Sequence, residues 1–174
     1  MCSSDLLTPA IQATAQVGEV TQTRSSAGQY NGFCQQGGLE VLARSGFLQD
    51  GPRVAREAIA LAEAPPCPPG VMDVVLMPDQ MMLQIHESIG HPLELDRILG
   101  DERNFAGTSF VTPDMFGHYR WGSEVLNVSH DPLQPHEFAS FGFDDEAQPA
   151  TRQRIIERGV LMRPLGGALS VRRA

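Results

Sequence analysis

The sequence lacks the marks of a nucleic-acid-binding or membrane-spanning protein. Thirteen basic residues stand against 21 acidic ones, the formal net charge is −8, and no dense basic stripe occurs. Because phosphate backbones are bound by clustered cations, we expect no nucleic-acid partner. No apolar run approaches the roughly 20 residues of a transmembrane helix, so we expect no membrane partner either.

Cysteine is scarce, and its placement excludes a disulfide framework. The three cysteines, Cys2, Cys34 and Cys67, are widely spaced and form no C-x-x-C pair for zinc or redox chemistry. We interpret Cys34 as a small packed side chain, because no histidine or basic residue lies near it in the sequence to activate a thiolate. Cys67 is flanked by prolines and is expected to be exposed.

Aromatic residues are also few, at 6%, whereas 17 glycines and 13 prolines predict many turns and short elements. Hydrophobic residues reach 41%, which is typical of a globular protein. Residues 1–10 contain neither a basic stretch nor a long apolar segment, so they do not form a secretory signal. We therefore expect a soluble, intracellular protein.

The first third of the chain predicts a hairpin followed by two helices. Residues 11–17 alternate between apolar and polar side chains, the period of a half-buried strand, and residues 20–24 are rich in threonine. A loop rich in Gly, Ser and Asn follows, and then a short helix at residues 39–47. Residues 51–64 have a stronger helical pattern, which ends at two prolines.

The remainder of the chain begins after a proline-rich linker at residues 64–70. Residues 71–77 are almost entirely apolar and predict a buried strand that leads into a helix capped by Asp79. Later strands are predicted at residues 152–157 and 160–163 as a hairpin. The fold class is α+β, an antiparallel or mixed sheet with a few helices, in which the helix carrying the metal motif is entered from a strand.

Residues 84–96 carry the most definite chemical pattern, H-E-x-x-x-H, formed by His86, Glu87 and His91. On a regular helix, at about 100° per residue, histidines five residues apart point about 140° away from each other. To bind one ion, the helix must widen as in a π-bulge or break near His91. Gly90 tolerates distorted backbone angles and Pro92 disfavours the helical region for His91, so both favour such a distortion.

Two imidazoles and an adjacent carboxylate suit a zinc hydrolase. His86 and His91 would be metal ligands, and Glu87 would act as general base on a water molecule. The alternative to a metal site is a pair of histidines near a helix end that hydrogen-bond only to solvent or backbone. A catalytic zinc also needs a third protein ligand. Candidates for the third ligand in the sequence are Glu94, Asp96, His118, His130, His136 and the cysteines.

Several segments, in order along the chain, resemble the TldD/PmbA family of zinc metallopeptidases. The similar segments are QYNGFCQQGGLEVL, HESIGHPLELD, GDERNFAGTSFV and FGFDDEAQPATRQRIIERGVL. The resemblance implies a cytoplasmic Zn²⁺-dependent peptidase that hydrolyses small or unfolded peptides, in peptide maturation and in toxin–antitoxin turnover. It also implies a dimer with an identical or related subunit. His86 and His91 would be ligands and Glu87 the catalytic base, as in the metal-bearing TldD type.

The same resemblance implies that this chain is a central fragment. Residues 1–66 would be the end of the family's N-terminal α/β region, and residues 67–174 the central region with the HExxxH helix and the β-hairpin. The family's third ligand is a cysteine of a C-terminal, mainly β domain, which we expect to be absent here. The alternatives are a non-catalytic partner subunit or truncated remnant that binds a related subunit, and a small metal-binding module without peptidase activity.

Overall fold

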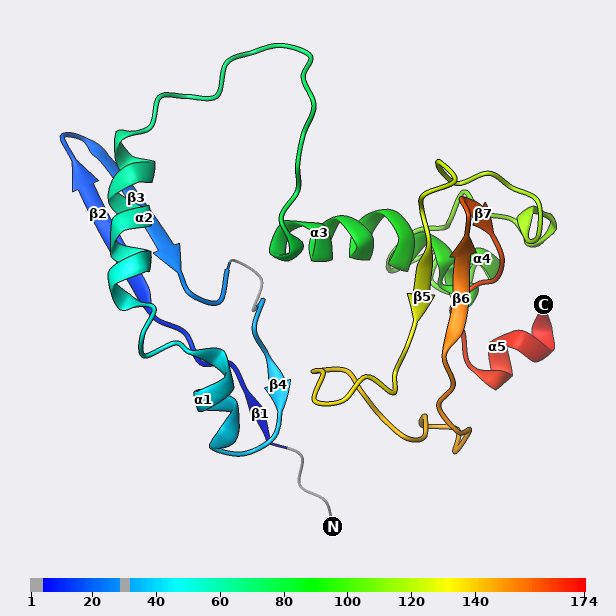
Figure 1. The fold of residues 1–174 in the computed structure, drawn as a ribbon. Helices are drawn as coiled ribbons and strands as arrows, with labels where there is room; N and C mark the ends of the chain where they lie inside the picture. Colours follow the sequence, from blue (N-terminus) through cyan, green and yellow to red (C-terminus); the bar gives the residue numbers. More distant parts are fainter. Residues whose placement is uncertain (1–4, 29–31) are drawn as a thin grey trace. The chain divides into compact units, whose positions relative to one another are not determined.

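The computed structural model describes residues 5–28 and 32–174, so the position of Cys2 lies outside the described residues. The chain forms two compact units (Figure 1). The first unit contains the described residues up to Leu83 together with His136–Phe138. The second contains Gln84–Pro135 and Ala139–Ala174. The domain boundary predicted between residues 66 and 67 remains a prediction.

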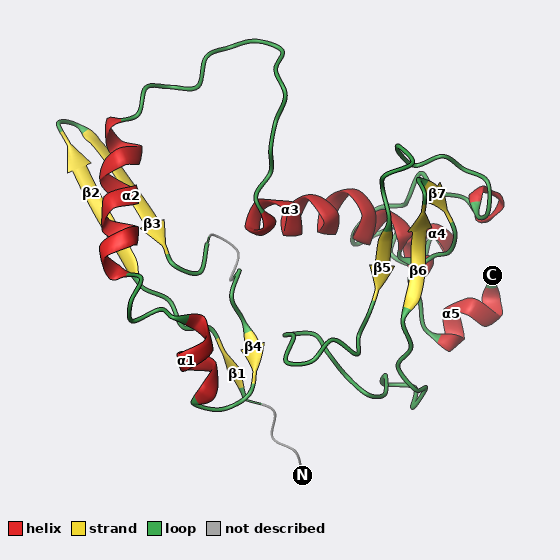
Figure 2. Ribbon diagram, in the orientation of Figure 1, coloured by secondary structure: helices red, strands yellow, loops and turns green. Residues whose placement is uncertain are grey.

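The first unit is built on a two-stranded antiparallel hairpin, as the sequence predicts. Strand β2 (Gln12–Val17) pairs with β3 (Val20–Ser25) over its whole length, and Gly18 turns the chain with a φ of 60°. Helix α2 (Gly51–Glu63) lies along the hairpin (Figure 2). The residues that α2 buries are spaced four apart and form one stripe, namely Val54, Ala58 and Ala62.

A second small sheet completes the first unit. Strand β1 (Leu6–Leu7) pairs antiparallel with β4 (Gln35–Gln36), and the Gln36 amide donates a hydrogen bond to the His136 carbonyl at 2.8 Å. Helix α1 (Glu40–Ser45) follows and ends at Gly46 in the left-handed region. Cys34 is partly buried, and this burial raises the pKa of its thiol, in agreement with a packed rather than reactive role.

The strand predicted at residues 71–77 is not formed, which corrects the expected entry into the motif helix. The segment is irregular up to α3 (Pro78–Ile85), and Val71, Val74 and Val75 are largely exposed. A strand requires a neighbour that exchanges backbone hydrogen bonds with it, and no described segment pairs with this one. Apolar composition alone therefore does not make the strand. Cys67, just before this segment, is exposed as predicted.

The second unit contains a three-stranded antiparallel sheet in the order β5-β6-β7. Its strands are β5 (Val128–His130), β6 (Gln153–Glu157) and β7 (Val160–Leu161). The predicted β6-β7 hairpin is confirmed, and it turns at Arg158 and Gly159, both with positive φ. A Cβ at Gly159 would collide with the carbonyl oxygens of Gly122 and Ser123, so the turn has room only for glycine.

Three short helical elements also belong to the second unit. In chain order they are α4 (Leu95–Leu99), η3 (Pro113–Met115) and α5 (Ala168–Arg173). The main core joins the sheet to the segment that carries the metal motif, through Ile89, Leu93, Val111, Ile155, Ile156 and Leu161. The fold is thus α+β with antiparallel sheets, as predicted.

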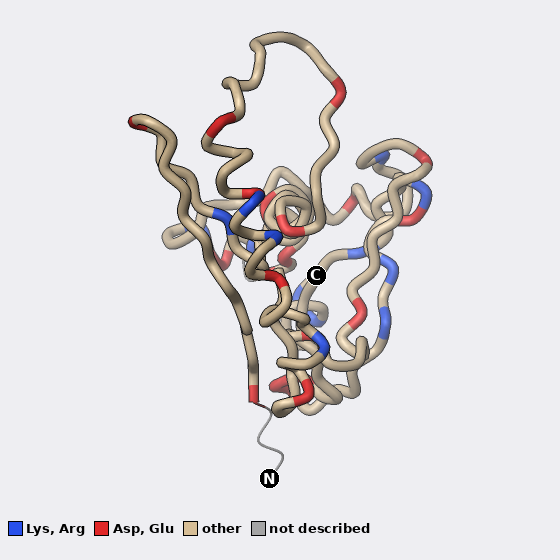
Figure 3. The backbone as a smooth tube through the Cα atoms, turned by 60° about the vertical axis from the view of Figure 1, so that its left-hand side comes forward, with Lys and Arg blue, Asp and Glu red and all other residues tan. Residues whose placement is uncertain are grey.

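Charged residues of both signs are interspersed along the backbone (Figure 3). Many of the arginines pair with carboxylates, for example Arg53 with Asp50 and Glu57. Within the described residues, no helix combines the length and the apolar character needed to cross a membrane.

The core of the second unit yields a stability prediction. Ile156 is fully buried, so Ile156→Ala is expected to lower the free energy of unfolding by about 2–5 kcal/mol. Val125→Ala is the matched control, because Val125 is 89% exposed and its loss should change stability by less than about 0.5 kcal/mol. Denaturant unfolding followed by the fluorescence of the single tryptophan, Trp121, reports on this core. Equal midpoints for the two variants would contradict the assignment.

Candidate metal centre

The helix that carries the motif widens where the spacing requires it. After α3 ends at Ile85, His86–Gly90 form a π-helical turn, closed by a hydrogen bond from the His91 amide to the His86 carbonyl. This i→i+5 bond brings two residues five apart onto one side of the helix. The predicted π-type distortion is confirmed.

The departures from helical backbone angles that Gly90 and Pro92 were expected to favour do not occur. Gly90 has φ −56° and ψ −69°, and His91 has φ −58° and ψ −44°, so both stay in the right-handed helical region. A Cβ at Gly90 would meet only the Ile85 carbonyl oxygen, at 3.8 Å. The bias that Pro92 places on His91 is a preference. Ile89 and Leu93, on either side of His91, are buried in the core with residues of the sheet.

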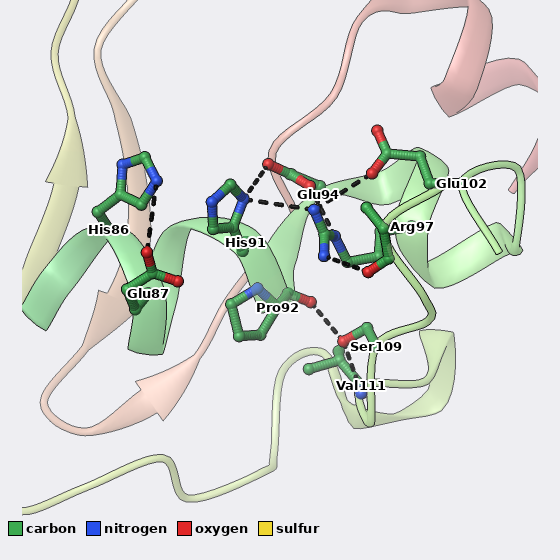
Figure 4. Close-up of polar contacts among 10 residues, drawn as sticks. His86, Glu87, His91, Pro92, Glu94, Arg97, Glu102, Ser109 and Val111 are labelled. Atoms are coloured by element: carbon green, nitrogen blue, oxygen red, sulfur yellow. Dashed lines mark hydrogen bonds and ion pairs between the residues drawn. The ribbon is translucent and has the colours of Figure 1, made fainter. Parts of the chain in front are cut away.

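The turn brings the three motif side chains together. The rings of His86 and His91 meet edge to face with centroids 4.3 Å apart, and Figure 4 shows both on the same side of the helix. His86 Nε2 lies 4.0 Å from Glu87 Oε1. One ligand atom from each of the three residues lies within 4.8 Å of the others, and no other such group of His, Cys, Asp or Glu occurs in the described part of the chain.

This donor set fits a divalent transition metal. Imidazole nitrogens bind zinc at about 2.0–2.1 Å, so two of them on a tetrahedral ion stand about 3.3 Å apart. In the structure, one ligand atom from each motif residue lies within 4.8 Å of the others, which is the same scale of separation. All three side chains remain accessible to solvent, with His86 and Glu87 at 58% and 61% exposed.

The His91 ring is held by a hydrogen bond at its Nδ1 nitrogen. Its Nδ1 lies 2.7 Å from Glu94 Oε1, and Arg97 Nε donates to Glu94 Oε2 at 2.8 Å (Figure 4). Partial burial is the largest single influence on the Glu94 carboxyl and raises its pKa. The hydrogen bonds from His91 and Arg97, with the Arg97 charge, outweigh burial, so the pKa of Glu94 is lowered overall and the group is a carboxylate.

Arg97 connects this carboxylate to the loop that follows α4. Its side chain is only 15% exposed, and it donates from Nη1 to the Ala106 carbonyl at 2.9 Å and pairs from Nη2 with Glu102 at 3.2 Å. Ser109 Oγ also donates to the Pro92 carbonyl at 2.6 Å. The loop and the end of the motif are thus fastened to each other at several points.

The other candidate ligands do not join the motif. Glu94 is engaged by His91 and Arg97, and Asp96 accepts a hydrogen bond from Ser170 Oγ at 2.9 Å. Among the described residues, the remaining candidates form no metal-holding group with the motif: His118, His130, His136, Cys34 and Cys67.

Sequence reasoning missed the support that Glu94 and Arg97 give to His91. Their i, i+3 spacing on a helix start is a recognisable pairing signal, and it could have suggested the ion pair. The further link to Glu102 and the Ala106 carbonyl depends on the path of the loop and has no local signal.

Comparison with known proteins identifies the family. A family model described as the PmbA/TldA metallopeptidase C-terminal domain matches residues 69–173. The chain belongs to the PmbA/TldD family. The family resemblance noted in the sequence is thereby confirmed.

Relatives within this family are named as metalloproteases. Metalloprotease MJ0996 of Methanocaldococcus jannaschii is 36% identical over 104 residues, covering 60% of this chain and 21% of that protein. A metalloprotease of Methanothermobacter thermautotrophicus is 32% identical over 125 residues, with 72% and 26% covered. The metalloprotease TldD homolog of Buchnera aphidicola is 32% identical over 103 residues, with 59% and 20% covered.

A solved structure shares the fold. The crystal structure of Thermotoga maritima TM0727 superposes with a TM-score of 0.63 at 19% identity, covering 94% of this chain and 34% of that one. The chain therefore spans between about a fifth and a third of the length of the proteins that it matches.

The geometry of the π turn predicts that Gly90 is replaceable. Gly90→Ala is expected to keep or raise the free energy of unfolding, by up to about 1 kcal/mol, because the backbone is helical there and alanine restricts the unfolded chain. Gly159→Ala is the control at a positive φ, where the added Cβ collides with backbone, and it should lose more than about 1 kcal/mol. Denaturant midpoints measure both. A Gly90 variant as damaged as the Gly159 variant would show that the turn needs glycine.

Proposed function

We propose that this chain carries the metal-binding part of a Zn²⁺-dependent peptidase that hydrolyses small or unfolded peptides. The observation that carries the proposal is the π turn, which gathers His86, Glu87 and His91 within 4.8 Å of one another. Membership of a metallopeptidase family supports it. The proposal extends to a cytoplasmic location and to a dimer with an identical or related subunit.

Each motif residue has one role in the proposed chemistry. The imidazole nitrogens of His86 and His91 would hold the ion. Zinc, when bound, supplies a Lewis acid that polarises a peptide carbonyl and acidifies a nearby water. Glu87 accepts the proton of the attacking water on a carboxylate oxygen and then delivers it to the leaving amine nitrogen. Its high exposure lets both water and substrate reach that oxygen.

We also propose that the third protein ligand comes from outside the residues that the structure describes. A catalytic zinc takes three protein ligands, and the described residues bring only two histidines and Glu87 together. The relatives are about four to five times as long as the segment that matches them, so they have further chain from which a ligand can come.

Replacing the general base should separate hydrolysis from metal binding. Glu87→Gln is expected to lower the rate of peptide hydrolysis by about 10²–10⁴-fold, because the amide cannot accept the proton of the attacking water. Zinc affinity, measured by calorimetric titration, should stay within about threefold, because both histidines remain. Glu157→Gln is the control, at a half-buried glutamate on β6 outside the motif, and should leave both quantities unchanged.

Unaltered hydrolysis by Glu87→Gln would contradict the enzyme assignment. A wild-type chain that binds zinc but cleaves no unfolded peptide, even when the further chain that supplies the third ligand is present, would favour the non-catalytic partner instead. A wild-type chain that binds no zinc would remove the metal site itself.

A further inference from the structure

We propose that Glu94, held by Arg97, is a positioning residue that keeps the His91 proton on Nδ1 and leaves Nε2 free to bind the metal. This inference rests on the proposed function, because it assigns a role to a neighbour of the same site. Neither residue belongs to the H-E-x-x-x-H motif, and their effect reaches the metal only through the His91 ring.

The hydrogen bonds at His91 Nδ1 define where the ring proton lies. Glu94 Oε1 is 2.7 Å from this nitrogen and Arg97 Nη2 is 3.4 Å from it. A carboxylate only accepts and a guanidinium only donates, so a single ring nitrogen cannot satisfy both. The shorter contact is with Glu94, and therefore Nδ1 carries a proton. In the neutral ring, the lone pair then lies on Nε2.

Arg97 fixes the orientation of the Glu94 carboxylate. Each carboxylate oxygen has its own partner, Oε1 with His91 and Oε2 with Arg97 Nε at 2.8 Å. Arg97 is largely buried, and its other nitrogens are taken by the Ala106 carbonyl and Glu102. The carboxylate therefore cannot rotate toward the ion without leaving a mostly buried guanidinium partly unpaired, which costs free energy.

The two histidines are held unequally. His86 is 58% exposed, and its contacts in the described structure are the His91 ring and Glu87 Oε1 at 4.0 Å, which is beyond hydrogen-bond distance. His91 is 35% exposed and tied through Glu94 to buried groups. The structure thus presents one ring with its tautomer and orientation set in advance, and a second ring that adjusts to the ion. A carboxylate on the distal nitrogen of a metal-binding histidine commonly raises metal affinity in this way.

The tautomer of His91 is directly measurable without metal. Long-range ¹H–¹⁵N NMR of the metal-free chain at a pH of about 8, where a typical imidazole is neutral, distinguishes a protonated Nδ1 from a protonated Nε2. The wild type is expected to show the Nδ1–H form. In Glu94→Gln, Arg97 can only donate and so claims the amide oxygen, which turns the amide NH₂ toward His91 Nδ1. The variant should therefore shift His91 to the Nε2–H form.

Two further variants test the geometry. Glu94→Ala removes the acceptor and should give a mixture of tautomers. Glu124→Gln is the matched control, because Glu124 is also an ion-paired glutamate of the second unit, bound to Arg158 at 3.2 Å and without contact to His91. It should keep the wild-type spectrum. A purely structural role for Glu94 would leave the His91 tautomer unchanged in all variants.

Metal titration adds a second readout. Titrations with Zn²⁺ followed by calorimetry, and with Co²⁺ followed by visible absorption, are expected to show affinity about 10–100-fold weaker in both Glu94 variants and unchanged in Glu124→Gln. Wild-type affinity and an unchanged Nδ1–H signal in Glu94→Gln would overturn the inference while leaving the metal site intact. A different outcome is that the wild type binds no metal, while His91 still changes from the Nδ1–H to the Nε2–H tautomer in Glu94→Gln. That result would overturn the proposed function and uphold the positioning of His91.

Discussion

One backbone hydrogen bond decides whether the motif can act as a site. The bond from the His91 amide to the His86 carbonyl closes a turn one residue wider than an α-helical turn, and it places two imidazoles edge to face. The same turn buries Ile89, and Leu93 follows it into the core. The geometry of the site is therefore stabilised by packing of the second unit, and residues that touch no metal maintain it.

Support for the site extends beyond the turn through charge. Glu94 and Arg97 tie the distal nitrogen of His91 to the Ala106 carbonyl and to Glu102. A mostly buried arginine held by two carboxylates and a carbonyl leaves little freedom for the ring that it supports indirectly. The residues that follow the motif in the sequence therefore help to hold the His91 ring. This is a physical reason why the similarity to the family continues beyond the motif itself.

Local patterns predicted those features of the fold that local forces determine. The alternation in residues 11–17 and the threonine-rich residues 20–24 predicted the β2-β3 hairpin, and the strand patterns of residues 152–157 and 160–163 predicted the β6-β7 hairpin. The five-residue spacing of the histidines predicted a π-type distortion. Residues 71–77 failed as a strand because pairing depends on a neighbour that composition does not reveal. The departures from helical backbone angles expected from Gly90 and Pro92 do not occur, because Gly90 and His91 both keep right-handed helical angles.

X-ray absorption at the zinc edge tests the central claim most directly. Zinc added to the wild-type chain should show two imidazole nitrogens at about 2.0–2.1 Å, with the imidazole scattering reduced in both His86→Ala and His91→Ala. Zinc bound through oxygen atoms alone, or a spectrum that neither substitution changes, would contradict the assignment of the π turn as a metal centre.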